Sequence, residues 1–404
     1  MSTAFLCSDE LLERFQALDQ FLHAHQHLWR PRPFQHLSLP WEAEFPELAN
    51  WLRSRTLEQA KESDACLANL AAPEPFPELA RQAFHLAALG ELPCSSALTH
   101  PDSFSVDVPG RKLAQIQAFA SHLPFARQPR HWVDWCSGKG HLGRWLTQAQ
   151  QRLTCLEYDP ALVESGNQLS LRLGVDAEHL QQDVLAADSD RHLDATRTPV
   201  ALHACGDLHV RLLQLASSRG CTQLAVAPCC YNRIASTHYQ PLSAAAQASQ
   251  LLLSRDDLAL PLCETVTAGA RVRRLRDRSM AWRLAFDLLQ RQLRNIDQYL
   301  PTPSLPGHWF DKPFPQFCED LANLRNLPSP GSQDWQDLEA RGWQRLAEVR
   351  NLELLRNLFR RPLELWLLLD RALYLMEQGY SVRLGSFCDY RLSPRNLLLL
   401  AERP

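Results

Sequence analysis

The sequence predicts an α/β protein built on a parallel, doubly wound sheet, with helical regions before and within the sheet. Three observations lead to this prediction. Residues 131–228 alternate short apolar segments with helical segments, the pattern of βαβ units. A glycine-rich turn follows the first apolar segment, in the run HWVDWCSGKGHLG at 131–143. Residues 1–105 and 235–361 instead show apolar residues at helical spacing.

The composition is that of an ordinary globular protein. The 404 residues are 45% hydrophobic and 22% charged, which is enough chain for two domains. No apolar run is long enough to span a bilayer, and no secretory signal is recognised at the start, so we expect a cytoplasmic protein without membrane contact. The twelve cysteines are then expected as reduced thiols. A net charge of −3 does not by itself indicate a nucleic-acid partner, and nothing indicates the oligomeric state.

Residues 1–108 are predicted to form a helical N-terminal domain. Apolar residues recur at helical spacing in two segments, 78–89 is a third candidate helix, and proline-rich joints separate them. The periodic residues are Phe15, Leu18, Phe21 and Leu22, then Leu48, Trp51 and Leu52. His23, His25 and His27 alternate along a helix and face different sides, so we expect them in solvent rather than on a metal.

The first part of the sheet domain is predicted at 109–234. Pro109-Gly110 interrupts the chain, and 111–123 follows as an amphipathic helix. Lys112 and Gln115 lie one turn apart on this helix, where they either reach the glycine turn or cover the edge of the sheet. Strands are expected at 131–136, 153–158, 178–182, 199–204 and 223–228.

The glycine-rich turn is the expected cofactor site. A strand, a turn containing Gly138 and Gly140, and a helix N-terminus form a nucleotide-sized corner. The second strand ends on Glu157, where a carboxylate is placed to accept both hydroxyls of a ribose. The turn permits two interpretations. Gly138, Gly140 and Gly143 match the dinucleotide pattern G-x-G-x-x-G, whereas Asp134 ahead of the turn favours an S-adenosylmethionine site.

Polar and sulfur-containing residues follow the fourth and fifth strands. Ligands of doubly wound sheets bind outside the carboxyl ends of the strands, so these residues are candidates for the site. The residues concerned are His203, Cys205 and Asp207, then Cys229, Cys230, Tyr231 and Asn232. Cys136 follows the first strand at the same edge, and no neighbouring lysine or arginine is evident that would activate a thiol.

Three runs carry a family resemblance. VDWCSGKGHLGRWL, HACGD and APCCYN together resemble a branch of class I S-adenosylmethionine-dependent methyltransferases marked by a GKGH turn and a Cys-Cys-Tyr or Cys-Cys-His motif. The branch includes tRNA ribose 2′-O-methyltransferases and glutathione S-transferase C-terminal domain-containing proteins. Ser393-Pro394-Arg395-Asn396-Leu397 resembles the entry to its last strand. The resemblance covers about 109–234 and 362–404, and it departs at Cys136, where the usual opening has its first glycine.

The resemblance implies a Rossmann-like seven-stranded class I methyltransferase sheet, S-adenosylmethionine as the cofactor, and two groups of site residues. The cofactor-binding group is Lys112, Asp134, Cys136, Ser137, Gly138, Gly140, Glu157 and Asp183, with Asp183 expected at the adenine amino group. The methyl-transfer group is His203, Cys205, Asp207, Cys229, Cys230, Tyr231 and Asn232. His203 and Asp207 are the candidate general bases, and the cysteines and Tyr231 are expected to form the pocket wall.

A metal site is the alternative for the cysteines. Zinc or an iron–sulfur cluster would use Cys136, Cys205, Cys229 and Cys230. The chain has no C-x-x-C pair among them, and adjacent cysteines suit tetrahedral ligation poorly, so no metal is expected.

Residues 235–361 are predicted to be a helical insertion. A segment at 271–294 carries eight arginines against Asp277 and Asp287. Its apolar face is expected to be Leu275, Trp282, Phe286, Leu289 and Leu293. A basic helix of this kind binds RNA phosphates, binds an acidic partner, or is simply solvated. Trp309 and Phe310 are able to stack on bases, although core packing is the expectation.

Residues 362–404 are predicted to return to the sheet, with a leucine-rich helix at 362–378 and strands at 380–387 and 396–400.

Three functions remain open. They are an RNA methyltransferase acting on tRNA or rRNA, a methyltransferase of small molecules or proteins, and a cofactor-binding module without catalysis.

Overall fold

The computed structural model describes residues 5–64, 66–95, 98–262 and 269–403, so the first four residues of the expected N-terminal domain lie outside it. By their contacts the residues divide into two compact units, and each is described by itself. Unit 1 comprises 1–23, 86–264 and 362–404, and unit 2 comprises 24–85 and 265–361. This division differs from the expected boundaries, because helices of the predicted N-terminal domain group with the predicted insertion.

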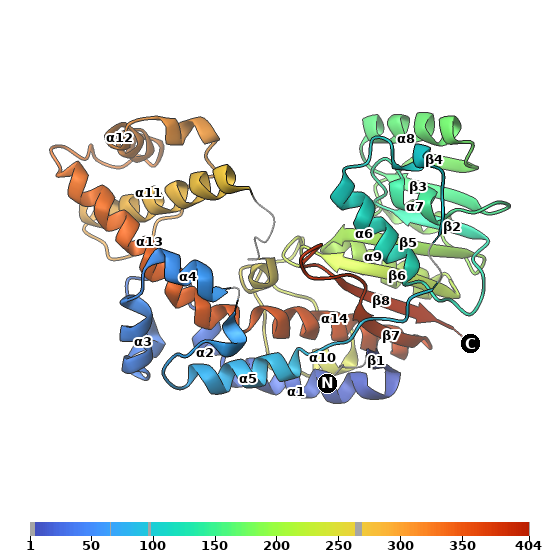
Figure 1. The fold of residues 1–404 in the computed structure, drawn as a ribbon, viewed down its shortest axis with the longest axis horizontal. Helices are drawn as coiled ribbons and strands as arrows, with labels where there is room; N and C mark the ends of the chain where they lie inside the picture. The colour runs from blue at the N-terminus through green and yellow to red at the C-terminus, as the bar shows by residue number, and fades with distance from the viewer. Residues whose placement is uncertain (1–4, 65, 96–97, 263–268, 404) are drawn as a thin grey trace. The chain divides into compact units, whose positions relative to one another are not determined.

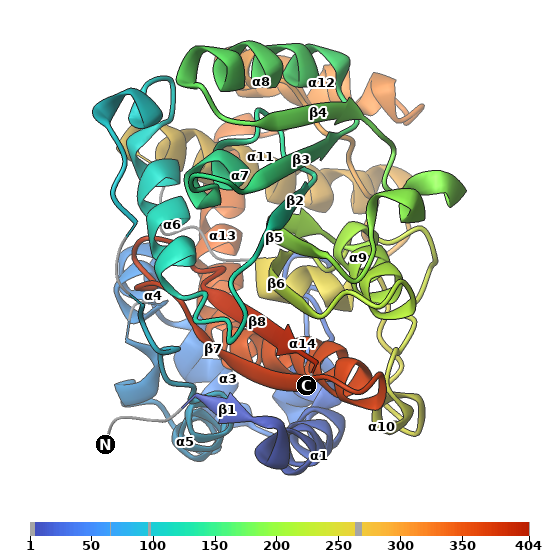
Figure 2. The same ribbon diagram turned by 90° about the vertical axis from the view of Figure 1, so that its right-hand side faces the viewer.

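Unit 1 is built on one eight-stranded sheet, with the order β1-β7-β8-β6-β5-β2-β3-β4. Figure 2 shows the strands side by side in this order. The strands are β1 (Leu6–Cys7), β2 (His131–Trp135), β3 (Arg152–Glu157), β4 (Ala177–Gln181), β5 (Arg197–Cys205), β6 (Gln223–Cys229), β7 (Ser381–Ser386) and β8 (Leu397–Glu402). From β4 to β6 the strands are parallel, and β8 lies antiparallel between β6 and β7.

The strand predictions hold to within two residues at each end of the five parallel strands. The predicted antiparallel pair near the C-terminus is also present, as β7 and β8. The expected number of strands was wrong by one. Leu6 and Cys7 pair with Leu384 and Arg383 of β7, so the N-terminal region adds an edge strand. Two residues are too few for an alternating pattern to be visible in the sequence.

Helices cover both faces of the sheet. The helices α6 (Gly110–Ser121) and α7 (His141–Leu146) pack on one face, where Ile116, Phe119 and Trp145 share a core with Trp132 and Val200. The helix α9 (Asp207–Ser218) lies on the opposite face in Figure 2. Its His209 is bonded to Arg371 of α14 (Arg360–Glu377). The remaining elements of this unit are α8 (Pro160–Leu173), α10 (Ala244–Gln247) and 3₁₀ turns at Asp102–Ser105, Ala187–His192 and Asp257–Leu262.

The helix α1 (Ser8–Ala24) runs from unit 1 to the boundary of unit 2, and its buried residues include Phe15 and Leu18, as the periodicity predicts. Unit 2 is helical, and Figure 1 labels its α-helices. They are α2 (Gln26–Trp29), α3 (Pro46–Arg53), α4 (Leu57–Asp64), α5 (Phe76–Leu86), α11 (Ala270–Arg294), α12 (Phe314–Leu324) and α13 (Trp335–Asn357). Short 3₁₀ turns occur at Pro40–Ala43, Leu67–Asn69 and Gly307–Asp311.

Unit 2 is held together by polar contacts between its two chain segments as well as by its core. Arg53 of α3 bonds to Glu348 of α13 at 3.0 Å, and the Asn351 amide of α13 donates to the carbonyl oxygens of Arg55 and Thr56. Buried Trp282 and Phe317 join α11 to α12. Residues 24–85 therefore belong structurally with 265–361. Among the described helices of both units, none has the length and apolarity to cross a bilayer.

Candidate functional site

The glycine-rich turn connects β2 to α7 at the carboxyl edge of the sheet. Gly138 and Gly140 both have left-handed backbone, with φ of 56° and 71°. A Cβ on Gly140 would lie 2.7 Å from the His179 ring and 2.8 Å from Cys155 Sγ, so this glycine is required by packing. Among the described residues, apart from the two chain neighbours, no atom lies within 4 Å of where a Cβ on Gly138 would be, so at this glycine the main chain is open to a ligand.

Cys136 has a backbone conformation that is more usual for glycine. Its φ is 58°, a left-handed value that side-chain-bearing residues rarely adopt. The turn after it remains tight, because the Ser137 N–H donates to Leu156 and the Gly140 N–H donates to Ser137. The departure from the family pattern at Cys136 therefore leaves the turn closed. Burial, with nearby carboxylates, raises the Cys136 pKa to about 12, so this thiol is neutral.

Asp134 is buried beneath the turn and anchors the helix that follows. Its Oδ2 accepts from the Gly143 N–H at 2.9 Å, which ties the end of β2 to the first turn of α7. Burial raises the pKa of this carboxyl to about 6, although the Gly143 bond and Lys112 act in the other direction. Asp134 thus stabilises the connection between β2 and α7, underneath the glycine turn.

A cavity of about 430 Å³ opens beside the turn. It is lined on the helix side by Lys112 and Gln115, as their spacing on α6 suggested, and on the turn side by Asp134, Cys136, Ser137 and Gly138. His203 and Leu202 of β5 complete the lining, with Pro109, Arg111, Ile116 and Leu142. The volume is within the range of small-ligand sites.

Glu157 ends β3 and braces the turn. Its Oε2 accepts from the Gly138 N–H at 2.8 Å and its Oε1 accepts from the Asp159 N–H at 3.0 Å. Each oxygen keeps a lone pair for a further donor. Glu157 is half-buried and is not among the residues that line the 430 Å³ cavity.

Asp183 follows β4 and is exposed, with Oδ1 accepting from the Leu185 N–H at 2.9 Å. Two exposed apolar side chains follow β3 and β4, and neither of them was identified as a site residue in the sequence analysis. They are Tyr158, 71% exposed, and Leu185, 49% exposed. These two residues are recognised by their exposure in the folded protein, and exposure of an apolar side chain cannot be deduced from a sequence pattern.

His203 is the candidate base that reaches the cavity. Its Nε2 lies 3.0 Å from Gln115 Oε1, an acceptor, so Nε2 carries the ring hydrogen and Nδ1 is the basic nitrogen. Burial first, then Arg395 and Lys112, lower its pKa to about 4, so the ring is neutral near pH 7. Its backbone is left-handed, with φ of 67°, beside a register shift between β5 and β6.

Asp207, the other candidate base, has a backbone partner. Its Oδ2 accepts from the Ala235 N–H at 2.7 Å, and its own N–H donates to the Arg233 carbonyl at 3.0 Å. It does not line the cavity. Asp207 therefore fastens the loop after β6 to the start of α9, a role that the sequence did not reveal.

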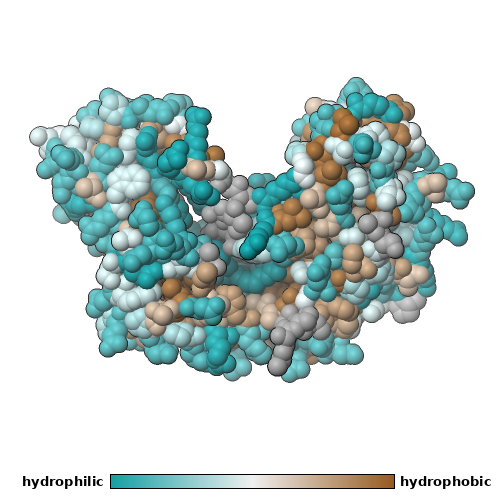
Figure 3. All heavy atoms as spheres, in the orientation of Figure 1, coloured by the Kyte–Doolittle hydropathy of each residue, from teal (hydrophilic) through white to brown (hydrophobic). Residues whose placement is uncertain are grey.

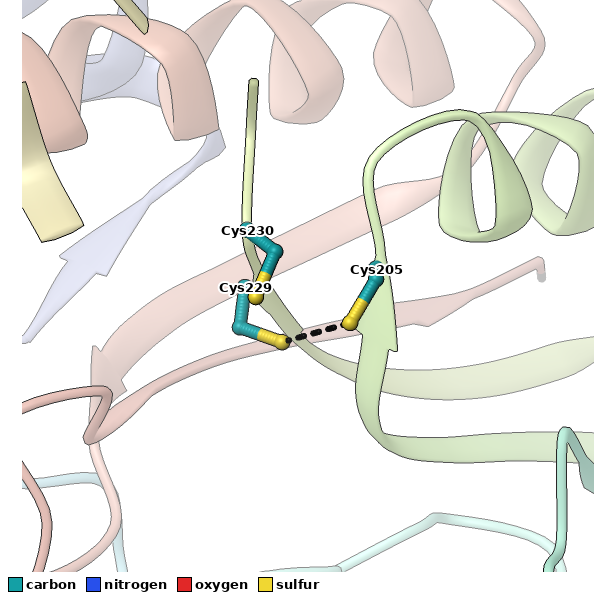
Figure 4. Close-up of side chains that lie close together, drawn as sticks. All are labelled: Cys205, Cys229 and Cys230. Carbon is teal, nitrogen blue, oxygen red and sulfur yellow. Dashed lines mark hydrogen bonds between the residues drawn. The ribbon is translucent and has the colours of Figure 1, made fainter. Parts of the chain in front are cut away.

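Cys205, Cys229 and Cys230 come together at the ends of β5 and β6, as Figure 4 shows. Cys205 Sγ lies 3.5 Å from Cys229 Sγ, and the three sulfur atoms all lie within 4.8 Å of one another. Cys136 is outside this group. None of the three cysteines lines the 430 Å³ cavity, whose nearest link to them is His203. The His203 carbonyl oxygen lies 3.4 Å from Cys229 Sγ.

Two arginines stand near the thiols, contrary to the expectation from the sequence. Hydrogen bonds from Cys205 and Cys229, then Arg233 and Arg395, lower the pKa of Cys230 against the effect of burial. Hydrogen bonds with Cys205 and Cys230, and then burial, raise the pKa of Cys229. Arg395 comes from the loop before β8, so its proximity depends on the closure of the sheet, which no local pattern shows.

Tyr231 points into the core, where only 1% of it is exposed. Its ring packs edge-on against His209, and the Arg371 guanidinium lies 5.1 Å from its centroid. Arg371 in turn donates to His209 Nε2 at 2.7 Å, while His209 Nδ1 bonds to the Ala204 carbonyl. Tyr231 was expected in the pocket wall, but it instead belongs to a buried network with His209 and Arg371. Asn232 is half-buried in the loop that follows.

The arginines of α11 divide into two groups. Arg283, Arg291 and Arg294 are bonded within unit 2, to Pro303, to Asp287 and to Gln290 respectively. The other five lie in the first turns of the helix and are exposed, although Arg278 also donates to the Phe310 carbonyl at 3.2 Å. They are Arg271, Arg273, Arg274, Arg276 and Arg278. The surface over α11 to α13 is mostly hydrophilic in Figure 3. The basic surface is thus shorter than the sequence suggested.

The aromatic residues of unit 2 pack as expected. Phe310 is buried, and Trp309 packs edge-on against Phe317 with Lys312 Nζ 4.5 Å from its ring centroid. The predicted apolar face of α11 is wrong at Leu275, which is 40% exposed. Its other members, Trp282, Phe286, Leu289 and Leu293, join one core cluster.

Comparison with known protein families gives one match. Residues 111–237 match the sequence model of a family described as a methyltransferase domain. This segment contains the turn, most of the cavity residues and the three cysteines. No curated protein matches the chain.

Among solved structures, one similar protein is an S-adenosylmethionine-dependent methyltransferase from Agrobacterium tumefaciens, with 10% identity and a TM-score of 0.24 over 30% of this chain and 45% of that one. Another, from Aquifex aeolicus, has 13% identity and a TM-score of 0.21 over 31% and 66%. Geranyl diphosphate C-methyltransferase from Streptomyces coelicolor A3(2) has 14% identity and a TM-score of 0.24 over 41% and 64%. The chain spans less than two thirds of the length of each.

The sheet and the family match lead to the same fold. The order β4-β3-β2-β5-β6 is that of a doubly wound sheet, and the antiparallel β8 and β7 complete it. This part of the chain has a Rossmann-like α/β fold, and its residues 111–237 match a methyltransferase domain.

Proposed function

We propose that the protein is an S-adenosylmethionine-dependent methyltransferase that acts on RNA. The observation that carries the first half of the proposal is the bond between Gly138 and Glu157. It holds an open glycine turn and a carboxylate at neighbouring strand ends, beside a cavity of about 430 Å³. A ligand with a ribose and a charged chain matches this combination of groups.

The residues present fit the cofactor. Gly138 leaves its main chain approachable because a Cβ there would meet only open space. Glu157 keeps acceptor capacity on both oxygens for the ribose hydroxyls. Tyr158 and Leu185 offer exposed apolar surface at the two strand ends for the adenine ring, with Asp183 as acceptor for its amino group.

When bound, S-adenosylmethionine supplies an electrophilic methyl group. The chain's own contribution at the acceptor is positioning and proton removal. His203 is neutral, with Nε2 fixed by Gln115, so Nδ1 is able to take a proton from an acceptor hydroxyl or amine. Lys112 at the cavity gives a positive charge to the helix side of the site.

RNA is proposed as the acceptor because of the first turns of α11. Five exposed arginines on two to three turns of helix form a basic surface that suits a phosphate backbone. The resemblance to ribose-methylating enzymes in the glycine turn and the Cys-Cys-Tyr motif supports the same acceptor. The ribose 2′-hydroxyl is a group from which His203 would remove a proton.

A small molecule is the second candidate acceptor. The observation that favours it is the cavity itself, whose lining by Leu202, Ile116 and Leu142 is partly apolar. Small-molecule sites are mostly apolar with a few polar groups, which describes this cavity as well.

Two measurements test the proposal. Calorimetric titration with S-adenosylmethionine and with NAD tests the cofactor; we expect heat of binding from the first alone, and NAD binding without a response to S-adenosylmethionine would refute it. Transfer of a labelled methyl group to total cellular RNA, with and without ribonuclease, tests the acceptor. Label that survives ribonuclease would favour the small-molecule candidate, or a protein.

A further inference from the structure

The three thiols at the ends of β5 and β6 are arranged in a way that neighbouring residues of a strand do not normally allow. Consecutive side chains of an extended chain point to opposite faces. Cys229 and Cys230 are consecutive, yet their sulfur atoms and that of Cys205 converge within 4.8 Å (Figure 4). The cause is the backbone of Cys230, whose φ of 47° is left-handed and turns its side chain back toward Cys229.

A second left-handed residue stands on the opposite strand. His203 has φ of 67°, next to the register shift that places Cys205 directly opposite Cys229. Left-handed backbone is strained in residues with a side chain, and it persists where the surrounding structure imposes it, often at ligand sites. One of these strained residues carries a sulfur atom of the group, and the carbonyl oxygen of the other, His203, lies 3.6 Å from Cys205 Sγ and 3.4 Å from Cys229 Sγ.

The loops that carry the thiols are fastened together. The Gly206 N–H donates to the Cys229 carbonyl at 3.1 Å, and the Arg233 N–H donates to the Cys230 carbonyl at 2.9 Å. Asp207 holds the same loop through Arg233 and Ala235. A Cβ on Gly206 would lie 1.9 Å from the Arg233 carbonyl oxygen, so the close approach requires glycine. The three thiols are therefore preorganised.

The spacing fits one class of ligand. In a tetrahedral site with zinc–sulfur bonds of about 2.3 Å, two sulfur ligands are about 3.8 Å apart. Cys205 and Cys229 are separated by 3.5 Å, and a small adjustment of Cys230 would complete a triangle of that size. Thiolates select zinc and other soft cations over magnesium or calcium. Arg233 and Arg395 are close enough to offset the charge of three thiolates around a divalent ion.

We propose that Cys205, Cys229 and Cys230 form a zinc site with three protein ligands and an exchangeable fourth position. Among the described residues, no other histidine, cysteine or carboxylate atom joins this group. Three protein ligands with an open position are the arrangement of catalytic zinc sites, whereas structural sites have four. His203 joins the site to the cavity, because its carbonyl faces Cys229 Sγ at 3.4 Å and its side chain lines the cavity. The site stands independently of the methyl-transfer proposal.

Cobalt substitution tests the proposal on the untagged full chain, kept reduced. Co²⁺ added to metal-free protein is expected to give sulfur-to-metal charge-transfer absorption and the strong visible bands of tetrahedral cobalt, at one ion per chain. One equivalent of Zn²⁺ should abolish both. Cys205→Ser, Cys229→Ser and Cys230→Ser should each weaken zinc binding by at least about tenfold, which is the lower range for losing even an outer partner of a metal.

Two controls separate this site from other thiols. The Cys7→Ser/Cys66→Ser/Cys94→Ser variant, which removes exposed cysteines elsewhere, should keep the cobalt spectrum. Cys221→Ser changes a buried thiol just before β6 and should also keep it, which controls for loss of folding. The proposal is overturned if the reduced protein gives no charge-transfer band, if the band survives Cys230→Ser, or if Cys205 and Cys229 are recovered as a metal-free disulfide.

Discussion

The backbone N–H of Gly138 donates to Glu157 Oε2 at 2.8 Å, and so joins the glycine turn after β2 to the end of the neighbouring strand β3. The bond gives the carboxylate two functions. It fixes the turn in the conformation that exposes the Gly138 main chain, and it holds the remaining lone pairs of Glu157 at the ribose position that we propose.

Glu157→Ala is therefore expected to weaken S-adenosylmethionine binding. Each charge-assisted hydrogen bond to a ribose hydroxyl contributes about 1.5–3 kcal/mol, so the dissociation constant should rise by at least about tenfold. Isothermal titration calorimetry measures it. Glu164→Ala removes an exposed carboxylate of α8 and should leave affinity unchanged. Equal affinity in both variants would mean that Glu157 does not hold the ribose.

Gly138→Ala and Gly174→Ala make a matched pair. Both glycines have left-handed backbone and open space where a Cβ would be, so both substitutions should cost stability to a similar degree, about 1–2 kcal/mol. Only the methyl group at 138 would stand where the cofactor approaches the main chain. We expect Gly138→Ala to lose S-adenosylmethionine binding and Gly174→Ala to retain it. Retention by both would place the cofactor elsewhere.

Reversal of charge at Arg273 and Arg274 tests the acceptor. If these side chains bind phosphates, Arg273→Glu/Arg274→Glu should weaken RNA retention. The slope of log affinity against log salt should then flatten by about 0.7–0.9 for each phosphate that the variant no longer neutralises. Filter binding of total tRNA over a range of salt concentrations measures both quantities.

Arg81→Glu/Arg341→Glu is the control for that experiment. Both residues are exposed arginines of unit 2, on α5 and α13, and each pairs with a carboxylate on its own helix. This variant has the same change in net charge and should keep the salt slope of the unmodified protein. Identical slopes for the two variants would show that the first turns of α11 are only a solvated surface.

Acid should destabilise unit 1 through three histidines, of which His179 is buried and His141 and His203 are half-buried. Burial lowers the pKa of His141, His179 and His203 to about 4, from 6.5. Between pH 6.5 and 4 the unfolded chain binds more protons than the folded one, so stability falls as pH falls through this window. The pKa of Asp134 is raised to about 6, so between pH 6 and 3.8 this carboxyl makes the folded protein more stable as the pH falls. It is a single group, whereas three histidines have the opposite effect.

Urea unfolding at pH 7.5 and pH 5 measures this loss. One unit of pKa shift corresponds to about 1.4 kcal/mol, so a clear drop in the unfolding midpoint is expected at pH 5. His179→Gln removes a histidine that packs against Gly140 and Gly166, and this variant should be less stable at pH 7.5 but lose less between the two pH values. A midpoint that does not change between pH 7.5 and 5 would contradict the prediction.

The parts of the structure that the sequence predicted are those governed by local pattern. Alternation of strands and helices, the glycine turn, and the placement of Asp134 beside it all follow from neighbours along the chain. Cys136 shows the limit of such reasoning. The usual opening of the family has a glycine at this position, yet the cysteine adopts a left-handed backbone and the hydrogen bonds of the turn around it are kept.

The features that escaped prediction depend on residues distant in sequence. Tyr231 was expected in a pocket wall, but Arg371 and His209 draw it into the core. Asp207 was expected to act on a substrate, but its carboxylate holds Ala235. The grouping of 24–85 with 265–361 rests on pairs such as Arg53 with Glu348. Side-chain interactions of this range leave no periodic signal in a single sequence.

The pairing of Leu6 with Leu384 has a consequence for synthesis on the ribosome. The edge strand β1 emerges long before its partner β7, and β6 emerges well before β8, its antiparallel neighbour. During translation of residues 235–396, the β6 edge therefore has no β8 partner in the nascent chain, and exposed strand edges are prone to aggregation. Folding of the sheet should finish only after β8 has left the exit tunnel. Chaperone dependence would then fall chiefly on this late interval, and truncation before β8 should yield insoluble protein.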